Sequence, residues 1–204
     1  MSEQFQETFR MARFNVRPPK GLPALLAAIA EDGFDMSCTD ETGQLLRFLA
    51  SVKPGCRALE IGTGAGVGST WLLDGMDDAS TLLTIEQDEQ VLALAREHLA
   101  DDSRVAFRHG DAGQVLLEDG IGPFDLIFSD AVPGKYELVA ETLALLAPAG
   151  IYVIDDMLPQ DDWPADHYPL AAGMVDRMAA LCETEQVTPV GLHWSTGLVL
   201  LTRN

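Results

Sequence analysis

The fold is decided by the stretch Glu60-Ile61-Gly62-Thr63-Gly64-Ala65-Gly66, which follows the apolar pair Ala58-Leu59 and precedes a helix-like run from Val67 to Met76. This pattern predicts a buried strand, a glycine turn and a helix. Glycines let the backbone turn tightly and approach a ligand, and the helix presents its free N–H groups there. A dinucleotide site would need a further glycine where the chain has Val67. The carboxylate of Glu60 instead favours a ligand that carries an ammonium group.

The next predicted strand places another carboxylate at the same edge of the sheet. Thr81 to Ile85 ends in Glu86, and Asp88 opens an amphipathic helix that runs through Leu99. Glu86 lies 20 residues beyond Gly66, the separation at which a strand-end carboxylate reaches a ribose diol in such folds. We therefore expect an adenosyl ligand. The alternative is that Glu86 and Asp88 only cap the helix.

Composition limits the class of protein. The 204 residues suit one α/β domain, and 13 basic against 32 acidic side chains give a net charge of −19 at pH 7. The electrostatic field of such a negative protein repels phosphate backbones and anionic lipids, so nucleic acid is a disfavoured partner. The longest apolar run, Leu22 to Ala30, is about half of what crosses a bilayer. The first twenty residues lack the apolar core of a signal peptide, and Cys38, Cys56 and Cys182 lack metal-like spacing, so we expect reduced thiols and a cytoplasmic protein.

Short apolar runs alternate with helical patterns along the chain. We expect strands at Arg57–Ile61, Thr81–Ile85, Val105–His109, Asp125–Ser129 and Ile151–Asp155. We expect helices at Val67–Met76, Asp88–Ala100, Gly113–Leu117, Tyr136–Leu146 and Leu170–Leu181. This alternation predicts a parallel sheet covered on both faces. The strand-like runs Val187–Trp194 and Leu198–Thr202 are so close together that they can pair only as an antiparallel hairpin.

The first part of the sequence is expected to form a helical lid. Helices are predicted at Leu22–Ala30 and Thr42–Ser51, the second capped by Thr39 or Asp40. We expect one domain, in which residues 1–51 form the lid region and residues 52–204 a Rossmann-like core. Arg10, Arg13 and Arg17 could bind an acidic group or a partner subunit, and the alternative is a solvated helical face.

Several segments, in this order, resemble the cation-dependent O-methyltransferases, the family that includes the catechol and caffeoyl-coenzyme A O-methyltransferases. The segments are Met36–Leu45, Leu59–Gly66, Gly110–Ala112, Phe124–Asp130 and Leu145–Asp156. The resemblance implies a class I methyltransferase fold, which is α/β and Rossmann-like, with a mostly parallel seven-stranded sheet ending in an antiparallel hairpin and helices on both faces. It also implies methyl transfer from S-adenosylmethionine to an oxygen of a small molecule.

The resemblance assigns the cofactor-binding residues. Glu60 would face the methionine end, Gly62 and Thr63 would border the sulfonium, and Glu86 would hold the ribose. Asp111 and Ala112 would flank the adenine, and Cys38 would contact the cofactor from the lid. The serine that the family has in the glycine turn falls at Gly68 here, beside Ser69. The full set is Cys38, Glu60, Gly62, Thr63, Gly64, Gly66, Gly68, Glu86, Asp111, Ala112 and Asp130.

A divalent cation is also implied by the resemblance. In the family this cation binds the acceptor hydroxyls and lowers their pKa. Asp130 ends the fourth predicted strand, and Asp155 and Asp156 end the fifth, so these three residues would hold Mg²⁺ or a similar ion. The family usually has Asp-Asn where this chain has Asp155-Asp156, which adds a negative charge.

The catalytic lysine of the family is displaced in this chain. The family places it three residues after the first metal aspartate, where this chain has Pro133. Lys135 is the candidate replacement, acting with Asp130, because the turn at Val132-Pro133-Gly134 can return its ammonium group to the site. The alternative is a solvated lysine in the first turn of a helix. The acceptor-binding carboxylate of the catechol enzymes is replaced by Pro189-Val190, so a catechol acceptor is not supported.

The segment Leu158–Pro169 follows the fifth strand, where open α/β sheets bind their substrates. Trp163 and His167 in this segment, together with Tyr136, are candidate acceptor contacts; alternatively, Trp163 covers the core edge and His167 opens a helix.

We expect an O-methyltransferase with a small-molecule acceptor, with a homodimer as one assembly to test. The alternatives are a metal-independent or tRNA-modifying methyltransferase, and a non-catalytic protein that binds S-adenosylmethionine.

Overall fold

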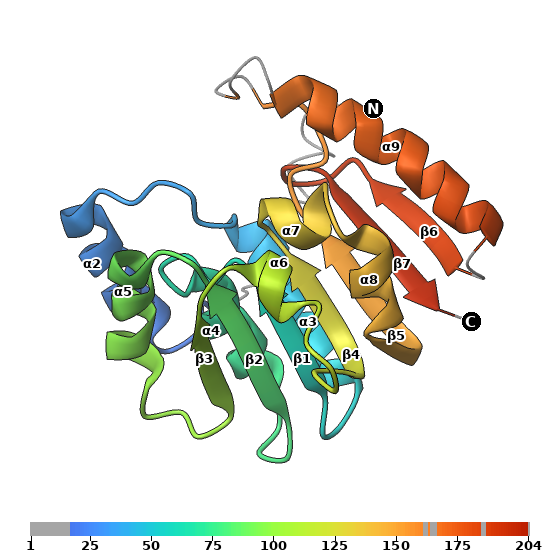
Figure 1. The fold of residues 1–204 in the computed structure, drawn as a ribbon. Coiled ribbons are helices and arrows are strands. Elements are labelled where there is room, and N and C mark those ends of the chain that lie inside the picture. Colours follow the sequence, from blue (N-terminus) through green and yellow to red (C-terminus); the bar gives the residue numbers. More distant parts are fainter. Residues whose placement is uncertain (1–16, 161–162, 164–166, 185–186, 204) are drawn as a thin grey trace, which may run out of the picture.

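A seven-stranded sheet runs through the molecule in the computed structural model, which describes residues 17–160, 163, 167–184 and 187–203 (Figure 1). Its strand order is β3-β2-β1-β4-β5-β7-β6. The strands are β1 (Arg57–Ile61), β2 (Thr81–Glu86), β3 (Val105–His109), β4 (Phe124–Ser129), β5 (Leu146–Ile154), β6 (Val187–Leu192) and β7 (Leu198–Arg203). β1 to β5 pair in parallel, whereas β7 is antiparallel to both β5 and β6. The predicted parallel sheet with an antiparallel hairpin is confirmed.

Helices cover both faces of this sheet. They are α2 (Leu22–Asp32), α3 (Asp40–Val52), α4 (Val67–Gly75), α5 (Glu89–Leu99), α6 (Ala112–Val115), α7 (Val132–Lys135), α8 (Val139–Ala144) and α9 (His167–Thr184). The single helix predicted at Tyr136–Leu146 is wrong, because Leu138 adopts a left-handed conformation at φ 55° and separates α7 from α8. His167 opens α9, three residues before the predicted start.

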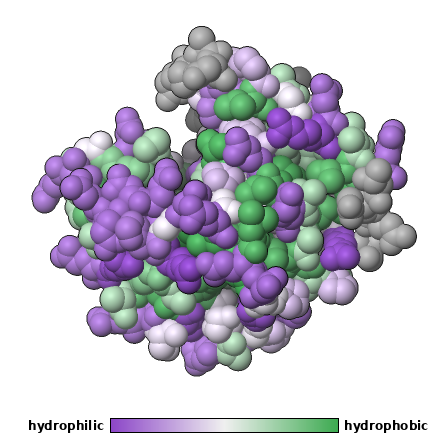
Figure 2. Space-filling model, viewed as in Figure 1, coloured by the Kyte–Doolittle hydropathy of each residue, from purple (hydrophilic) through white to green (hydrophobic). Residues whose placement is uncertain are grey.

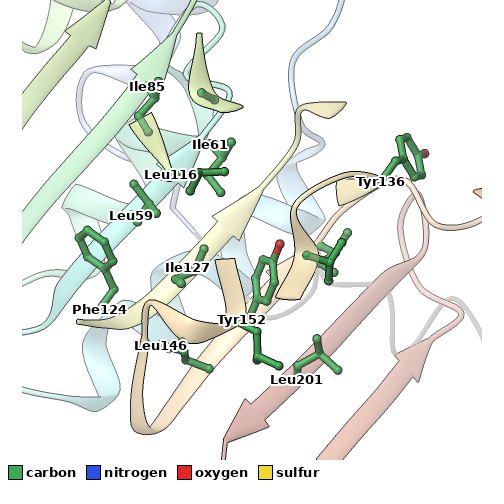
Figure 3. Close-up of a cluster of buried hydrophobic side chains, with 14 of the residues drawn as sticks. Leu59, Ile61, Ile85, Leu116, Phe124, Ile127, Tyr136, Leu146, Tyr152 and Leu201 are labelled. Carbon is green, nitrogen blue, oxygen red and sulfur yellow. The ribbon is translucent and has the colours of Figure 1, made fainter. Parts of the chain in front are cut away.

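The core lies on both sides of the central strands, because successive side chains of a strand point to opposite faces. Leu59, Ile127 and Tyr152 belong to the apolar cluster that α6, α8 and α9 cover, part of which Figure 3 shows. Ala58 and Val153 belong to a second cluster, which α3 and α4 cover. Burial on both faces explains why these strands are nearly continuous apolar runs. Because β1, β2 and β4 are parallel, the polar residues Glu60, Glu86 and Asp130 at their carboxyl ends lie along the same edge of the sheet.

The N-terminal helices are joined by a segment that reaches this edge. α2 packs through Leu25 and Ile29 against Trp71 of α4. Thr39 caps α3, as predicted, because its Oγ1 accepts a hydrogen bond from the backbone N–H of Thr42 at 3.1 Å. The two helices thus lie against the helical layer, and the linking residues 33–39 extend toward the strand ends. Arg10 and Arg13, for which we expected either contact with an acidic group or a partner subunit or a solvated helical face, lie outside the described residues. No described helix is long and apolar enough to cross a membrane.

Candidate active site

A pocket of about 320 Å³ opens at the carboxyl ends of β1, β2 and β4. Figure 2 shows the surface hollowed at the top of the view, between the part formed by α2 and α5 and the part formed by α9. The wall of the 320 Å³ pocket contains eight of the residues predicted to bind the cofactor: Cys38, Glu60, Gly62, Thr63, Gly64, Gly68, Glu86 and Asp130. Phe34, Val91 and Phe128 also line it, and no sequence signal marked them because each fits an ordinary apolar pattern.

The carboxylate of Glu60 has one free oxygen inside this pocket. Its Oε2 accepts hydrogen bonds from the hydroxyl groups of Ser69 and Thr84, whereas its buried Oε1 has no partner among the described residues. Burial raises the pKa of Glu60 to about 8. A Cβ at position 68 would collide with Oε1, so Gly68 keeps the approach to this oxygen open. An ammonium group of a ligand would satisfy Oε1, and Glu60 therefore fits the amino-acid end of S-adenosylmethionine.

The glycine turn that follows β1 is fixed by backbone hydrogen bonds. The N–H groups of Gly62 and Thr63 both donate to the carbonyl of Ile85, at 3.0 Å. Gly66 has φ 97°, and a Cβ there would come within 2.9 Å of the Cβ of Ala95 in α5. The turn therefore requires glycine at position 66 even though this residue is not in the pocket wall.

Glu86 and Asp88 have different roles. Asp88 caps α5, because its Oδ1 accepts from the N–H groups of Gln90 and Val91. Glu86 lies in the pocket wall, where its Oε2 accepts from the N–H of Gly64 at 2.9 Å. Helix capping is thus the role of Asp88, and the carboxylate of Glu86 faces the pocket, as a ribose ligand requires.

Asp111 and Ala112 lie at the start of α6. The Oδ1 of Asp111 accepts from the N–H of Gly113 at 2.8 Å and caps this short helix. Neither Asp111 nor Ala112 lines the pocket. Their predicted contact with an adenine ring stays a prediction.

Lys135 is buried between two of the predicted metal ligands. Its Nζ lies 2.9 Å from Oδ1 of Asp130 and 3.2 Å from Oδ2 of Asp156, and the residue is 4% exposed. Pro133 (φ −65°, ψ 134°) and Gly134 (φ 83°, ψ −23°) form a type II turn that directs Lys135 into the site. The predicted return of this lysine is confirmed, and the alternative of a solvated lysine is wrong.

The charges of this cluster influence one another. Burial raises the pKa of Asp130 to about 7, although the ammonium group of Lys135 opposes this. Burial alone would lower the pKa of Lys135, but Asp130 and Asp156 outweigh it and raise that pKa. Lys135 is therefore a stable cation, and Asp130 can exchange a proton near neutral pH.

The predicted divalent cation does not fit this arrangement. The carboxylates of Asp130 and Asp156 converge, as expected, but on the ammonium group of Lys135. Asp155 Oδ1 accepts hydrogen bonds from the hydroxyl of Thr196 and the N–H of Asp156. Within the described part of the chain, no group of three or more His, Cys, Asp and Glu side chains could hold a metal ion.

A second pocket, of about 700 Å³, adjoins the first. The two share residues of the linking segment and of the loop after β4: Met36, Ser37, Cys38, Asp130, Ala131 and Val132. Tyr136, Trp163 and His167 all line the second pocket, so the structure brings the three predicted acceptor residues together. The hydroxyl of Tyr136 lies 2.8 Å from Nε2 of His167, and the rings of Trp163 and His167 are 4.3 Å apart.

The turn between β6 and β7 connects the linking segment to the second pocket. The hydroxyl of Ser195 lies 2.5 Å from Oγ1 of Thr39 and 3.2 Å from Oγ1 of Thr42. The next residue, Thr196, donates to Asp155 and lines the pocket. Sequence reasoning missed both contacts, because their partners are 156 and 41 residues away.

Comparisons with known proteins agree with this geometry. A methyltransferase-domain family matches residues 59–157. A protein of Mycobacterium avium (strain 104) named as an O-methyltransferase is 31% identical over 191 residues, which are 89% of this chain and 86% of that protein. The crystal structure of the O-methyltransferase TomG from Streptomyces achromogenes in complex with SAM is similar, with a TM-score of 0.79, 26% identity and full coverage of both chains. The O-methyltransferase from Bacillus cereus in complex with SAH has the same fold, with a TM-score of 0.80 at 21% identity over 99% of this chain and 96% of that one.

The fold and the pocket at its carboxyl edge define a class I methyltransferase that uses S-adenosylmethionine. Because a relative at 31% identity spans 89% of the sequence, the chain belongs to the family of S-adenosylmethionine-dependent O-methyltransferases.

Proposed function

We propose that this enzyme methylates a hydroxyl group of a small aromatic molecule that binds in the 700 Å³ pocket. The observation that carries the proposal is the wall shared by the two pockets, which includes Cys38 and Asp130. An acceptor in the second pocket would thus meet the reactive end of a cofactor held in the first. Displacement at a sulfonium methyl needs such in-line placement.

The residues of the chain divide the work between the pockets. S-adenosylmethionine, when bound, supplies a methyl group on a sulfonium. Oε1 of Glu60 would hold its ammonium group, and Glu86 would accept from its ribose. In the second pocket, the contacting rings of Trp163 and His167 would form one aromatic wall beside the acceptor, and the carboxylate of Asp130 would take the proton of the acceptor hydroxyl.

Two of the predicted alternatives are less well supported. The net charge of −19 disfavours a tRNA substrate, because RNA binding relies on contacts to phosphates. A protein that only binds S-adenosylmethionine would not need the second pocket, in whose wall Asp130, Lys135 and Asp156 lie. A cytoplasmic location and a homodimer stay predictions.

The experiment is a screen with S-adenosylmethionine labelled on its methyl group. The acceptors would be phenols, hydroxybenzoates, aliphatic alcohols and bulk tRNA. We expect label in one or more phenolic compounds, and Asp130→Asn should slow transfer by about 10²-fold or more, the usual contribution of a general base. Label in tRNA alone, or in aliphatic alcohols alone, would contradict the proposal.

A further inference from the structure

The ammonium group of Lys135 occupies the place where the resemblance implied a metal ion. It lies 2.9 Å from the carboxylate of Asp130 and 3.2 Å from that of Asp156, at the ends of β4 and β5. A Mg²⁺ ion would need these oxygens at about 2.1 Å from its own centre. The ion and the ammonium group would therefore compete for the same space between the two carboxylates.

The position of Lys135 is built into the fold. At Gly134 a Cβ would come within 2.7 Å of Cδ1 of Ile61 and 2.8 Å of Oγ of Ser129, so the turn is packed directly on β1 and β4. The hydroxyl of Tyr152 in β5 donates to the carbonyl of Gly134 and holds the turn against the sheet. A lysine that follows such a turn has little freedom to leave the site, unlike a lysine on a solvated helix.

The ammonium group retains one N–H for a ligand. Of its three donors, two serve Asp130 and Asp156, and among the described residues no hydrogen bond uses the third. Lys135 lines the acceptor pocket, next to Asp130 in the wall shared with the cofactor pocket. The third donor can therefore reach an acceptor oxygen placed near the methyl donor.

We propose that Lys135 supplies, as a permanent part of the chain, the positive charge that a divalent cation supplies in the family that the sequence resembles. Its free N–H donates to the acceptor oxygen and stabilises the negative charge that develops as the proton leaves. The enzyme consequently needs no divalent cation. One N–H holds one oxygen, so a single hydroxyl suffices and a vicinal diol is not required. This inference rests on the proposed function for its acceptor.

The first test measures cation binding without activity. Wild type, Lys135→Ala and Lys135→Gln would be melted in millimolar Mg²⁺ and in chelator. We expect the melting temperature of the wild type not to change with Mg²⁺, and that of Lys135→Ala to rise by a few degrees, because the carboxylates of Asp130 and Asp156 then lack their ammonium partner and can bind the ion. Lys135→Gln retains more of the side-chain volume and should show the same gain if Lys135→Ala does not fold. Lys53→Ala, which removes an exposed lysine paired with Asp125, is the control and should respond like the wild type.

The second test measures methyl transfer by the wild type with the phenolic panel, with and without chelator. We expect unchanged rates in chelator and activity on compounds with one hydroxyl. Lys135→Ala should lose about 10²- to 10³-fold in rate, as when one oxyanion donor is removed. In the double variant Lys135→Ala/Asp156→Asn, which recreates the family's usual ligand set, adding Mg²⁺ should restore part of the lost methyl-transfer rate.

The outcomes separate this inference from the proposed function. A wild type that methylates phenols but loses activity in chelator, or that gains thermal stability from Mg²⁺, overturns the role of Lys135 and leaves the function intact. A wild type that binds S-adenosylmethionine in calorimetry but labels no phenol overturns the proposed function. Unchanged transfer by Lys135→Ala would also overturn the inference.

Discussion

Glu60 shows how one residue can be prepared for a ligand at a cost to the free protein. Its carboxylate is fully buried, and only Oε2 is hydrogen-bonded. A buried polar oxygen without a partner lowers stability by about 1–3 kcal/mol. The fold retains this unfavourable group at the wall of the cofactor pocket, where a cationic ligand would relieve it.

Glu60→Gln should weaken the binding of S-adenosylmethionine by about 10- to 100-fold, because a charge-assisted hydrogen bond to its ammonium group becomes a neutral one. Isothermal titration calorimetry would measure this affinity. Glu89→Gln, which changes a surface glutamate of α5 paired with Arg96, is the matched control and should bind like the wild type. Equal affinities of wild type and Glu60→Gln would contradict the assigned role.

The raised pKa of Glu60 also predicts how stability depends on pH. Burial raises this pKa to about 8 in the folded chain, against about 4.3 in an unfolded one. The folded state therefore holds the proton more tightly, and the free energy of unfolding falls as pH rises between these values. The melting temperature of the ligand-free wild type should decrease between pH 5 and 8, and Glu60→Gln should decrease less. Parallel curves for the two proteins would refute this account.

At the scale of elements, the turn at Pro133-Gly134 decides the chemistry of the site. Its positive φ at Gly134 and its packing on β1 place Lys135 between the carboxylates. Pro133 occupies the position where the resemblance led us to look for the lysine. A two-residue shift in sequence is thus compensated by the geometry of a tight turn.

Gly134→Ala should destabilise the protein by about 2–5 kcal/mol, the sum of left-handed strain and overpacking against Ile61 and Ser129. Urea denaturation would measure this change. Gly120→Ala is a matched control, because Gly120 has a similar φ of 78° and no neighbour within 4 Å of a Cβ. It should lose only the strain, about 1–2 kcal/mol. A smaller loss for Gly134→Ala than for Gly120→Ala would show that the turn yields without cost.

The linking segment should respond to the cofactor. Phe34, Met36, Ser37 and Cys38 line the pocket, and α2 and α3 on either side are packed on α4. We expect S-adenosylmethionine to slow amide exchange in residues 34–44, as measured by mass spectrometry. Residues 198–203 of β7 serve as the internal reference and should not change. If saturating cofactor leaves the amide exchange rates of residues 34–44 unchanged, this segment does not contact the cofactor.

Across the whole molecule, the sequence predicts what local patterns determine. The alternation of strands and helices, the glycine turn and the strand-end positions of Glu60, Glu86 and Asp130 depend on neighbours in the chain, and the structure bears them out. Contacts between distant residues are not encoded in this way. The pairing of Tyr136 with His167 crosses 31 residues and depends on where α9 packs.

The site shows the same division. Three strand-end aspartates were enough to expect a cluster of carboxylates, but the group at their centre depends on the dihedral angles of Pro133 and Gly134. Phe34 and Phe128 line the pocket without any pattern that separates them from core residues. Lining residues of this kind follow from packing and become visible only in three dimensions.

The turn that contains Ser195 and Thr196 has a consequence for how the enzyme is made. Its hydroxyl groups reach back to Thr39 and to Asp155, and both partners leave the ribosome well before the turn does. The residues that line the cofactor pocket, from Phe34 to Val132, are likewise all synthesised before this turn. The nascent chain therefore holds every residue of the cofactor pocket before it holds the turn that binds Asp155 and Thr39. Among the residues that line the two pockets, Thr196 is the last to be synthesised, so the cofactor side of the site is complete in sequence before the acceptor side.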